Sequence, residues 1–176
     1  IIRVPPKQIT VRIPDWSRPM TVEYIERHRD EITKQLRDLL SEPAVIFTTY
    51  SKDIPDNVGV DVVYEDEVSI NSINNICGKK TLVLNFYGKY AEGVRLNTCY
   101  RRVLLFTLPL LPSDVMRKLE TRGVSPKDVI VVKTIQSIGR IFPRNNDDYE
   151  VILLDSRFRE FCPQLTEYGV KCVEVE

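Results

Sequence analysis

Three clusters of polar residues carry groups that could bind phosphate or nucleic acid, and the first follows a short apolar run. Thr48-Thr49-Tyr50-Ser51-Lys52 combines three hydroxyls, an aromatic ring and an ammonium group. Hydroxyls and backbone amides at the end of a strand can hold a phosphate, and a tyrosine ring can stack on a base. The residue types therefore suit a nucleic-acid contact, and the alternative is an ordinary polar loop.

The second cluster is a glycine-containing segment that follows the apolar run Thr81–Phe86. Gly88 and Gly93 lie on either side of Lys89 and Glu92. Glycine lets the backbone approach a ligand closely, so this segment is a candidate for ligand contact. It is not a Walker A loop, because no Gly-Lys-Ser/Thr follows the required gap. A solvent-exposed turn is the alternative.

The third cluster places Gln136, Gly139, Arg140 and Arg144 within nine residues, on a predicted helix and its exit. Arginine binds phosphoryl oxygens in a bidentate manner and can stabilise charge on a transferring γ-phosphate. A glycine inside a helix costs about 1 kcal/mol relative to alanine, which indicates that something packs closely at Gly139. Scattered surface arginines are the alternative.

The elements that must position these clusters are short, β-branched apolar runs. Such continuous runs are typical of strands buried on both faces of a parallel sheet. The predicted strands are Ala44–Phe47, Gly59–Val63, Thr81–Phe86, Val103–Leu108, Val129–Val132 and Val151–Leu154. Helical segments between them, Pro112–Thr121 and Thr134–Ile141, predict the α/β class, with helices on both faces of the sheet. Open parallel sheets bind ligands at the carboxyl ends of their strands, so we expect the clusters at that edge.

The first forty residues differ in pattern from the rest. Residues 8–13 alternate as a short strand, and helical periodicity then runs from Thr21, a predicted N-cap, until Pro43. We expect 1–176 to be one domain, with 1–40 as a lead-in strand and covering helix and 41–176 as the core. The acidic run Glu65-Asp66-Glu67 is interpreted as a surface turn, and His28 as part of a solvated helix face.

Composition excludes several classes of protein. The 176 residues are 43% apolar and 28% charged, with 25 basic and 25 acidic residues, which is typical of a globular domain and argues against a wholly basic nucleic-acid binder. No apolar run approaches the roughly 20 residues of a membrane span, so we expect no membrane partner. The chain does not begin with Met, and we expect it to be a fragment of a longer protein.

The four cysteines lack the spacing of a metal knuckle. Cys77, Cys99, Cys162 and Cys172 are widely spaced, and His28 is the one histidine. We therefore expect no metal site in this chain and four reduced thiols in an intracellular protein. The alternative is a disulfide between Cys162 and Cys172.

Taken together, the clusters resemble a known family. In order, AVIFTTYSK, LVLNFYGKYAEGVRL, RRVLLFTLPLLP and QSIGRIFPRNNDDYEVILLDSRF resemble motif IV, motif V, a following strand with its Leu-Pro, and motif VI of the second motor domain of XPD/DinG-type helicases. These are superfamily 2, DNA-dependent ATPases that mostly move 5′ to 3′ on single strands. The resemblance spans residues 44–160, about two thirds of the chain. It implies a RecA-like fold.

The resemblance also implies roles for individual residues. Arg140 and Arg144 would be catalytic, supplying positive charge to the transferring phosphoryl group. The residues assigned to the nucleotide are Gln136, Gly139, Glu92 and Gly93. Those assigned to nucleic acid are Thr49, Tyr50, Lys52, Gly88 and Lys89.

The resemblance implies cofactors and partners as well. ATP and Mg²⁺ would be held mainly by a first motor domain that this chain lacks, and an iron–sulfur cluster could occur only in that missing part. Single-stranded DNA and the first motor domain are the implied partners, and the protein is expected to be a monomer. It would be cytoplasmic and nucleoid-associated in a bacterium or archaeon, and nuclear in a eukaryote. Because the chain lacks a Walker A loop and an Asp-Glu-Ala-His-like box, we expect it to be inactive as an ATPase on its own.

Three departures from the family pattern leave an alternative open. Arg95 stands where motif V has an acid, and Pro143 takes the place of the second motif VI arginine, so that Arg144 comes one position later. Only 26 residues separate Pro109 from Gln136, which implies a short helical insert. The alternative function is a degenerate, non-hydrolysing module for nucleic-acid binding or docking.

Overall fold

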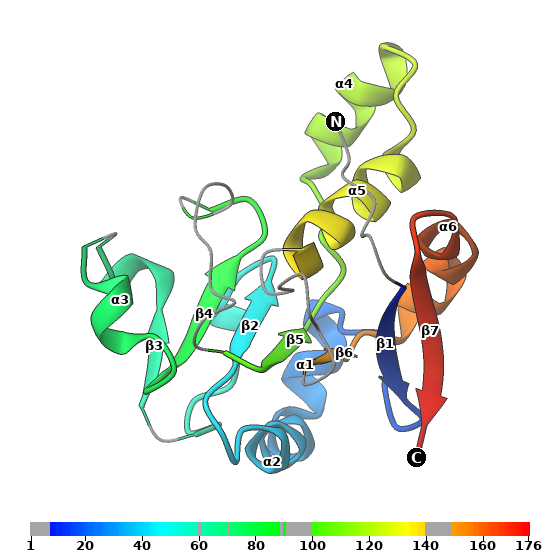
Figure 1. Ribbon diagram of the computed structural model, residues 1–176. Helices are drawn as coiled ribbons and strands as arrows, with labels where there is room; N and C mark the ends of the chain where they lie inside the picture. The colour runs from blue at the N-terminus through cyan, green and yellow to red at the C-terminus, as the bar shows by residue number, and fades with distance from the viewer. Residues whose placement is uncertain (1–7, 60, 70, 89, 91–99, 140–148) are drawn as a thin grey trace.

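A computed structural model of the chain describes residues 8–59, 61–69, 71–88, 90, 100–139 and 149–176 (Figure 1). The strands are β1 (Ile9–Pro14), β2 (Val45–Thr48), β3 (Val62–Tyr64), β4 (Thr81–Asn85), β5 (Arg102–Leu105), β6 (Glu150–Leu153) and β7 (Val170–Val175). The α-helices are α1 (Val22–Arg27), α2 (Arg29–Leu39), α3 (Ile73–Ile76), α4 (Ser113–Thr121), α5 (Pro126–Gly139) and α6 (Cys162–Glu167). Short 3₁₀ turns occupy η1 (Ser51–Asp53), η2 (Glu65–Glu67) and η3 (Ser156–Phe161).

All seven strands form one parallel sheet in the order β3-β4-β2-β5-β6-β1-β7. The α/β class predicted from the continuous apolar runs is confirmed, and the all-parallel sheet agrees with the RecA-like fold that the resemblance implies. The lead-in strand β1 lies inside the sheet, because Val11 pairs with Val151 of β6 on one side and with Cys172 of β7 on the other. β7 was not predicted from the sequence.

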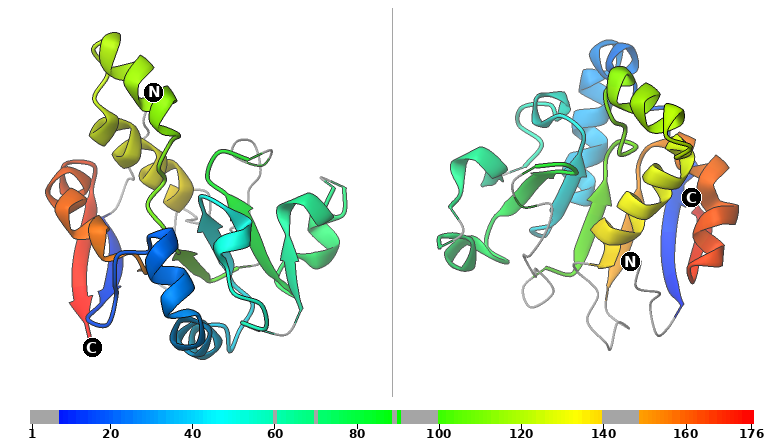
Figure 2. Two further views of the ribbon diagram at one scale, coloured as in Figure 1. Left: turned by 180° about the vertical axis from the view of Figure 1, so that it is seen from behind. Right: turned by 90° about the horizontal axis from the view of Figure 1, so that it is seen from above.

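Helices cover both faces of the sheet (Figure 2). Alternate residues of each strand point to opposite faces, so Val45 and Phe47 of β2 lie in one apolar cluster and Ile46 lies in the other. The first cluster packs against α5 and α6, and the second packs against α1 and α2. Both faces of β2 are thus covered by apolar side chains, which is why its four residues are all buried.

The run Val129–Val132, predicted as a strand, lies within α5. Pro126 opens this helix, and the buried positions recur with helical spacing at Ile130, Thr134 and Ile138. A four-residue apolar run cannot distinguish a strand from a buried helix segment, and the longer periodicity decides in favour of the helix. α4 buries none of its residues and stands away from the sheet together with the first turns of α5 (Figure 1).

The helix predicted from Thr21 onward is two helices that meet at His28. Thr21 is the N-cap, as predicted, and its hydroxyl accepts a hydrogen bond from the Tyr24 amide at 3.2 Å. His28 has a non-helical backbone, and its ring stacks on that of Tyr24 with centroids 4.1 Å apart. His28 is half-buried and its Nδ1 lies 3.1 Å from the Tyr24 carbonyl oxygen, so it is less solvated than the helix face predicted for it.

The expectation of four reduced thiols is also wrong. Cys162, at the start of α6, forms a disulfide with Cys172 of β7, and Cys77 is disulfide-bonded as well. Packing of α6 on β7 brings the Cα atoms of Cys162 and Cys172 to 6.0 Å, within the range that a disulfide spans. No helix in the described part of the chain is both long and apolar enough to cross a membrane.

Candidate nucleic-acid and nucleotide sites

The carboxyl ends of β2 and β5 are joined by a network of threonines. The Thr49 amide donates to Oγ1 of Thr107 at 3.0 Å, and the two hydroxyl oxygens are 3.0 Å apart. Thr49 Oγ1 also donates to the Leu108 carbonyl at 2.7 Å. The Thr49 hydroxyl is therefore committed to holding two strand ends together, and it fixes the direction of the chain that follows.

That following chain presents Tyr50 and Lys52 to solvent. Tyr50 is 49% exposed, which makes it one of the few large apolar side chains on the described surface. Lys52 is exposed, and its Nζ lies 5.6 Å from the centroid of the Tyr50 ring. This pair offers an aromatic face and a positive charge at one point of the sheet edge, a combination suited to a base and its phosphate.

A polar chain links this edge to the end of β4. Ser51 Oγ donates to Oδ1 of Asn85 at 2.9 Å, and Asn85 Nδ2 donates to Oε2 of Glu65 at 3.3 Å. Glu65 is 2% exposed, so the interpretation of the acidic run as a surface turn is wrong at this residue. Its side chain turns inward because Gly88 leaves room for it: a Cβ at position 88 would overlap both carboxylate oxygens.

Tyr87, next to Gly88, is held against two other elements. Its hydroxyl donates to the Pro109 carbonyl at 2.9 Å, and Lys133 Nζ of α5 lies 4.9 Å from its ring centroid. Burial of the hydroxyl raises the pKa of Tyr87 to about 12. Tyr87 therefore stays a neutral hydrogen-bond donor, and it links the end of β4 to the segment after β5 and to the middle of α5.

Asp155, directly after β6, is the buried acid of this edge. It is fully buried, and it accepts hydrogen bonds from Arg157 Nε at 3.0 Å and Nη2 at 2.7 Å. It also accepts from the Leu108 amide at 3.1 Å and the Arg157 amide at 3.0 Å. One carboxylate thus joins the ends of β5 and β6 and orients a guanidinium group toward the space between them.

That space is a cavity of about 360 Å³. Its walls come from the ends of β2 and β5, from the start of α1 and from the segment that leads into α4. They include Tyr50, Asp53, Thr107, Leu111 and Arg157. Asp53 is 9% exposed, and burial raises the pKa of its carboxyl group, with Lys52 and Arg29 acting in the opposite direction.

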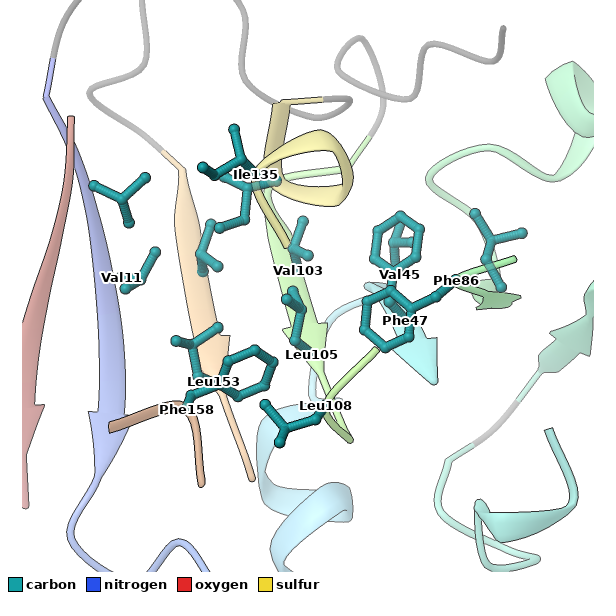
Figure 3. Close-up of a cluster of buried hydrophobic side chains, with 14 of the residues drawn as sticks. Val11, Val45, Phe47, Phe86, Val103, Leu105, Leu108, Ile135, Leu153 and Phe158 are labelled. Atoms are coloured by element: carbon teal, nitrogen blue, oxygen red, sulfur yellow. The ribbon is translucent and has the colours of Figure 1, made fainter. Parts of the chain in front are cut away.

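Gln136 and Gly139 lie at the other end of the sheet, contrary to the expectation that the three clusters share one edge. α5 connects two parallel neighbours, so it runs antiparallel to them and ends near the amino ends of the strands. Figure 3 shows Ile135 beside Val103, near the start of β5, while Leu108 and Phe158 lie at the opposite ends of the strands. The assigned nucleotide and nucleic-acid residues in the described chain are therefore on opposite edges.

Gly139 also departs from its expected role. It is the last residue of α5, and no described atom lies within 4 Å of the place where a Cβ would stand. Close packing against the described chain is thus not the reason for glycine here. Gln136 is exposed one turn earlier, so both residues face outward.

Several residues singled out in the sequence fall outside the described residues. They are Lys89, Glu92, Gly93, Arg95, Arg140, Pro143 and Arg144. The described residues hold no group of three or more His, Cys, Asp or Glu side chains that could bind a metal ion. Gln136 and Gly139 present an amide side chain and an open backbone, which fit one side of a nucleotide but could not enclose it.

Sequence reasoning missed Asp53, Glu65 and the pairing of Asp155 with Arg157. Asp53 could have been included in the prediction, because it directly follows the first polar cluster in the sequence. Asp155 and Arg157 directly follow a predicted strand, which is where a parallel sheet collects its functional side chains. Glu65 had no such signal, because its burial depends on Gly88, more than twenty residues away.

Comparison with known proteins shows the fold. No protein-family model matches the chain, and the search of curated proteins found no match. Among solved structures, Xpd4 from S. tokodaii matches 96% of the chain with a TM-score of 0.59 and 20% identity. A structure described as an XPD helicase matches 98% with a TM-score of 0.69, and an apo form of XPD matches 96% with a TM-score of 0.68, both at 18% identity. The chain spans 39%, 36% and 40% of these proteins, respectively.

Proposed function

We propose that this chain is the second motor domain of an ATP-dependent, XPD-type DNA helicase. The observation that carries the proposal is the fold likeness to an XPD helicase across 98% of the chain. The motif-like sequences along residues 44–160 support it independently, since they fall in the order that the family has. The likeness covers 36% of the XPD protein's length, which is the share expected of one motor domain in a larger helicase.

The proposed DNA-binding surface is the carboxyl edge of the sheet. Tyr50 offers its ring to a base, while Lys52 offers its charge to a phosphate. Gly88 and Lys89 are assigned there by the motif, and on its Cβ side Gly88 is already covered by the Glu65 carboxylate. The hydroxyl of Thr49 is already bonded to Thr107 and Leu108, so Thr49 contributes by fixing the chain that carries Tyr50 and Lys52.

The proposed nucleotide-facing surface is the end of α5. Gln136 and Gly139 are exposed there, and Arg140 follows directly in the sequence. Arg140, with Arg144, would stabilise negative charge on the transferring phosphoryl group of an ATP molecule bound mainly by the first motor domain. Mg²⁺ would neutralise phosphate charge in that same first domain.

Coupling between the two surfaces is proposed to run through the connection from β4 to β5. The chain leaves the carboxyl edge at Gly88 and reaches the amino edge at Arg102, where β5 begins. The motif V residues Glu92 and Gly93 belong to this connection. A change at the nucleotide can therefore be transmitted to the DNA edge, and closing and opening of two domains would ratchet the strand.

ATP hydrolysis by the complete protein, with and without single-stranded DNA, tests this function. We expect DNA-stimulated turnover that Arg140→Ala reduces by 10³-fold or more, as for other arginines that act on a transferring phosphate, with most DNA affinity retained. Arg122→Ala, at an exposed position after α4, is the control and should leave turnover unchanged. Absence of turnover with intact DNA binding would instead identify the degenerate binding module.

A further inference from the structure

The cavity at the ends of β2 and β5 contains a buried acid without a partner. Asp53 is 9% exposed, and its carboxylate makes no hydrogen bond or ion pair within the described chain. The carboxylate oxygens are not among the fully buried side-chain atoms that lack a partner, so they reach the open space of the cavity. A carboxylate that is largely withdrawn from water gains from N–H donors, because hydrogen bonds offset the free energy lost on leaving water. Asp53 is therefore available to a ligand that supplies N–H donors.

The same cavity also contains a hydrogen-bond donor that has no acceptor. Arg157 lines it, with Nε and Nη2 bonded to Asp155, and its Nη1 has no hydrogen bond to the described residues. A cationic ligand alone would satisfy Asp53 but would leave the Nη1 donor of Arg157, whose charge is already paired with Asp155, without an acceptor. A ligand edge that carries both donors and acceptors satisfies both groups.

The remaining walls suit a flat, apolar ring. Met20 and Leu111 contribute apolar surface, and two of the exposed large apolar residues, Val22 and Tyr50, stand at the same cavity. Its volume of about 360 Å³ falls in the range of about 300–1,000 Å³ that small-molecule pockets occupy. Single-stranded nucleic acid is commonly read in this way, with an unstacked base held on an aromatic ring and hydrogen-bonded at its edge.

We propose that this cavity is a base-reading pocket that receives one unstacked base of the single strand and prefers guanine. Guanine presents two adjacent N–H donors, N1 and N2, which match the two oxygens of Asp53. Its O6 and N7 accept from arginine, the commonest specific contact to that base. Thymine and cytosine lack the paired donors, and adenine has a single amino group. The inference rests on the proposed function, because the base arrives on the DNA that the carboxyl edge binds.

The test is fluorescence anisotropy of the complete protein with labelled dT12 and with dT12 carrying one dG at successive positions. We expect the best-placed dG to tighten binding about tenfold, within the discrimination of one good bidentate pair. Asp53→Asn, which replaces one acceptor with a donor, should bring this ratio close to one, and comparison with dT12 in the same variant cancels the general effect of the lost negative charge on DNA affinity. Asp56→Asn, at an exposed acid three residues on, is the matched control and should keep the ratio.

Each other outcome overturns the pocket in a distinguishable way. A ratio near one in the wild type, or a ratio that survives Asp53→Asn, overturns the pocket and leaves the helicase function standing. If the dG-to-dT12 affinity ratio is near one and Asp53→Asn alters ATP turnover, the Asp53 carboxylate pairs with a cationic side chain elsewhere in the protein and not with a base. Failure to bind any oligonucleotide, dT12 included, overturns the proposed function and the pocket together.

Discussion

Gly88 lies directly against the carboxylate of Glu65, so closely that any side chain at position 88 would occupy the space of both carboxylate oxygens. Glu65 is nearly inaccessible to solvent and is held by Asn85, which in turn is held by Ser51. The glycine of the second cluster thus has a structural cause. It allows a buried acid to join the ends of two neighbouring strands.

Gly88→Ala should therefore destabilise the protein. The added methyl group would push the Glu65 carboxylate off its hydrogen bond with Asn85 and out of its buried place, at a cost of about 1–3 kcal/mol that is measurable as a lower urea midpoint. Gly139→Ala is the control, since no described atom stands near its Cβ position and alanine favours the helix by up to about 1 kcal/mol. If both substitutions lowered stability equally, steric contact with Glu65 would not be the cause.

Asp155→Asn should be among the most damaging single substitutions at this edge. It removes the charge that pairs with Arg157 and weakens acceptance from the Leu108 amide, and breaking a buried ion pair costs about 3–5 kcal/mol. The comparison is Glu174→Gln, which removes the exposed ion pair with Arg159 and should cost less than about 1 kcal/mol. Equal losses in urea unfolding would contradict the distinction.

Asp53→Asn should stabilise the protein in a pH-dependent manner. Burial raises the pKa of Asp53 in the folded state, so the folded protein binds more protons than the unfolded chain in the window that begins near the ordinary value of 3.8. The free energy of unfolding therefore falls as pH rises through that window and Asp53 ionises. Asparagine stays neutral, so the variant does not lose this stability. Thermal midpoints should favour the variant at pH 7 and converge with the wild type below pH 3.8. An equal gain at both pH values would contradict ionisation as the cause.

Tyr50→Ala should weaken binding of single-stranded DNA by about 1–3 kcal/mol, the usual contribution of a stacked aromatic ring. Tyr50→Phe keeps the ring and should bind like the wild type. Because Tyr50 is half exposed, neither change should move the thermal midpoint by more than a few degrees. Anisotropy with dT12 measures the effect, and unchanged affinity in the alanine variant would remove Tyr50 from the DNA surface.

The sequence predicts most of the sheet but little of the detail at its edge. Continuous apolar runs such as Val103–Leu108 mark strands buried on both faces, and that signal is local. It fails at Val129–Val132, where helix and strand share the same short pattern. The inward turn of Glu65 and the opposite placement of Gln136 depend on contacts between distant segments, as does the hydrogen bond from the Leu108 amide that helps to bury Asp155. Such contacts leave no trace in spacing along the chain.

The interior position of β1 has a consequence for the way the protein acquires its structure. The partners of β1, strands β6 and β7, begin at Glu150 and Val170, more than 130 residues later in the chain. Both edges of β1 are unpaired until those strands have been synthesised. Such long-range pairing slows folding and exposes strand edges to other chains, so this interval is one of aggregation risk.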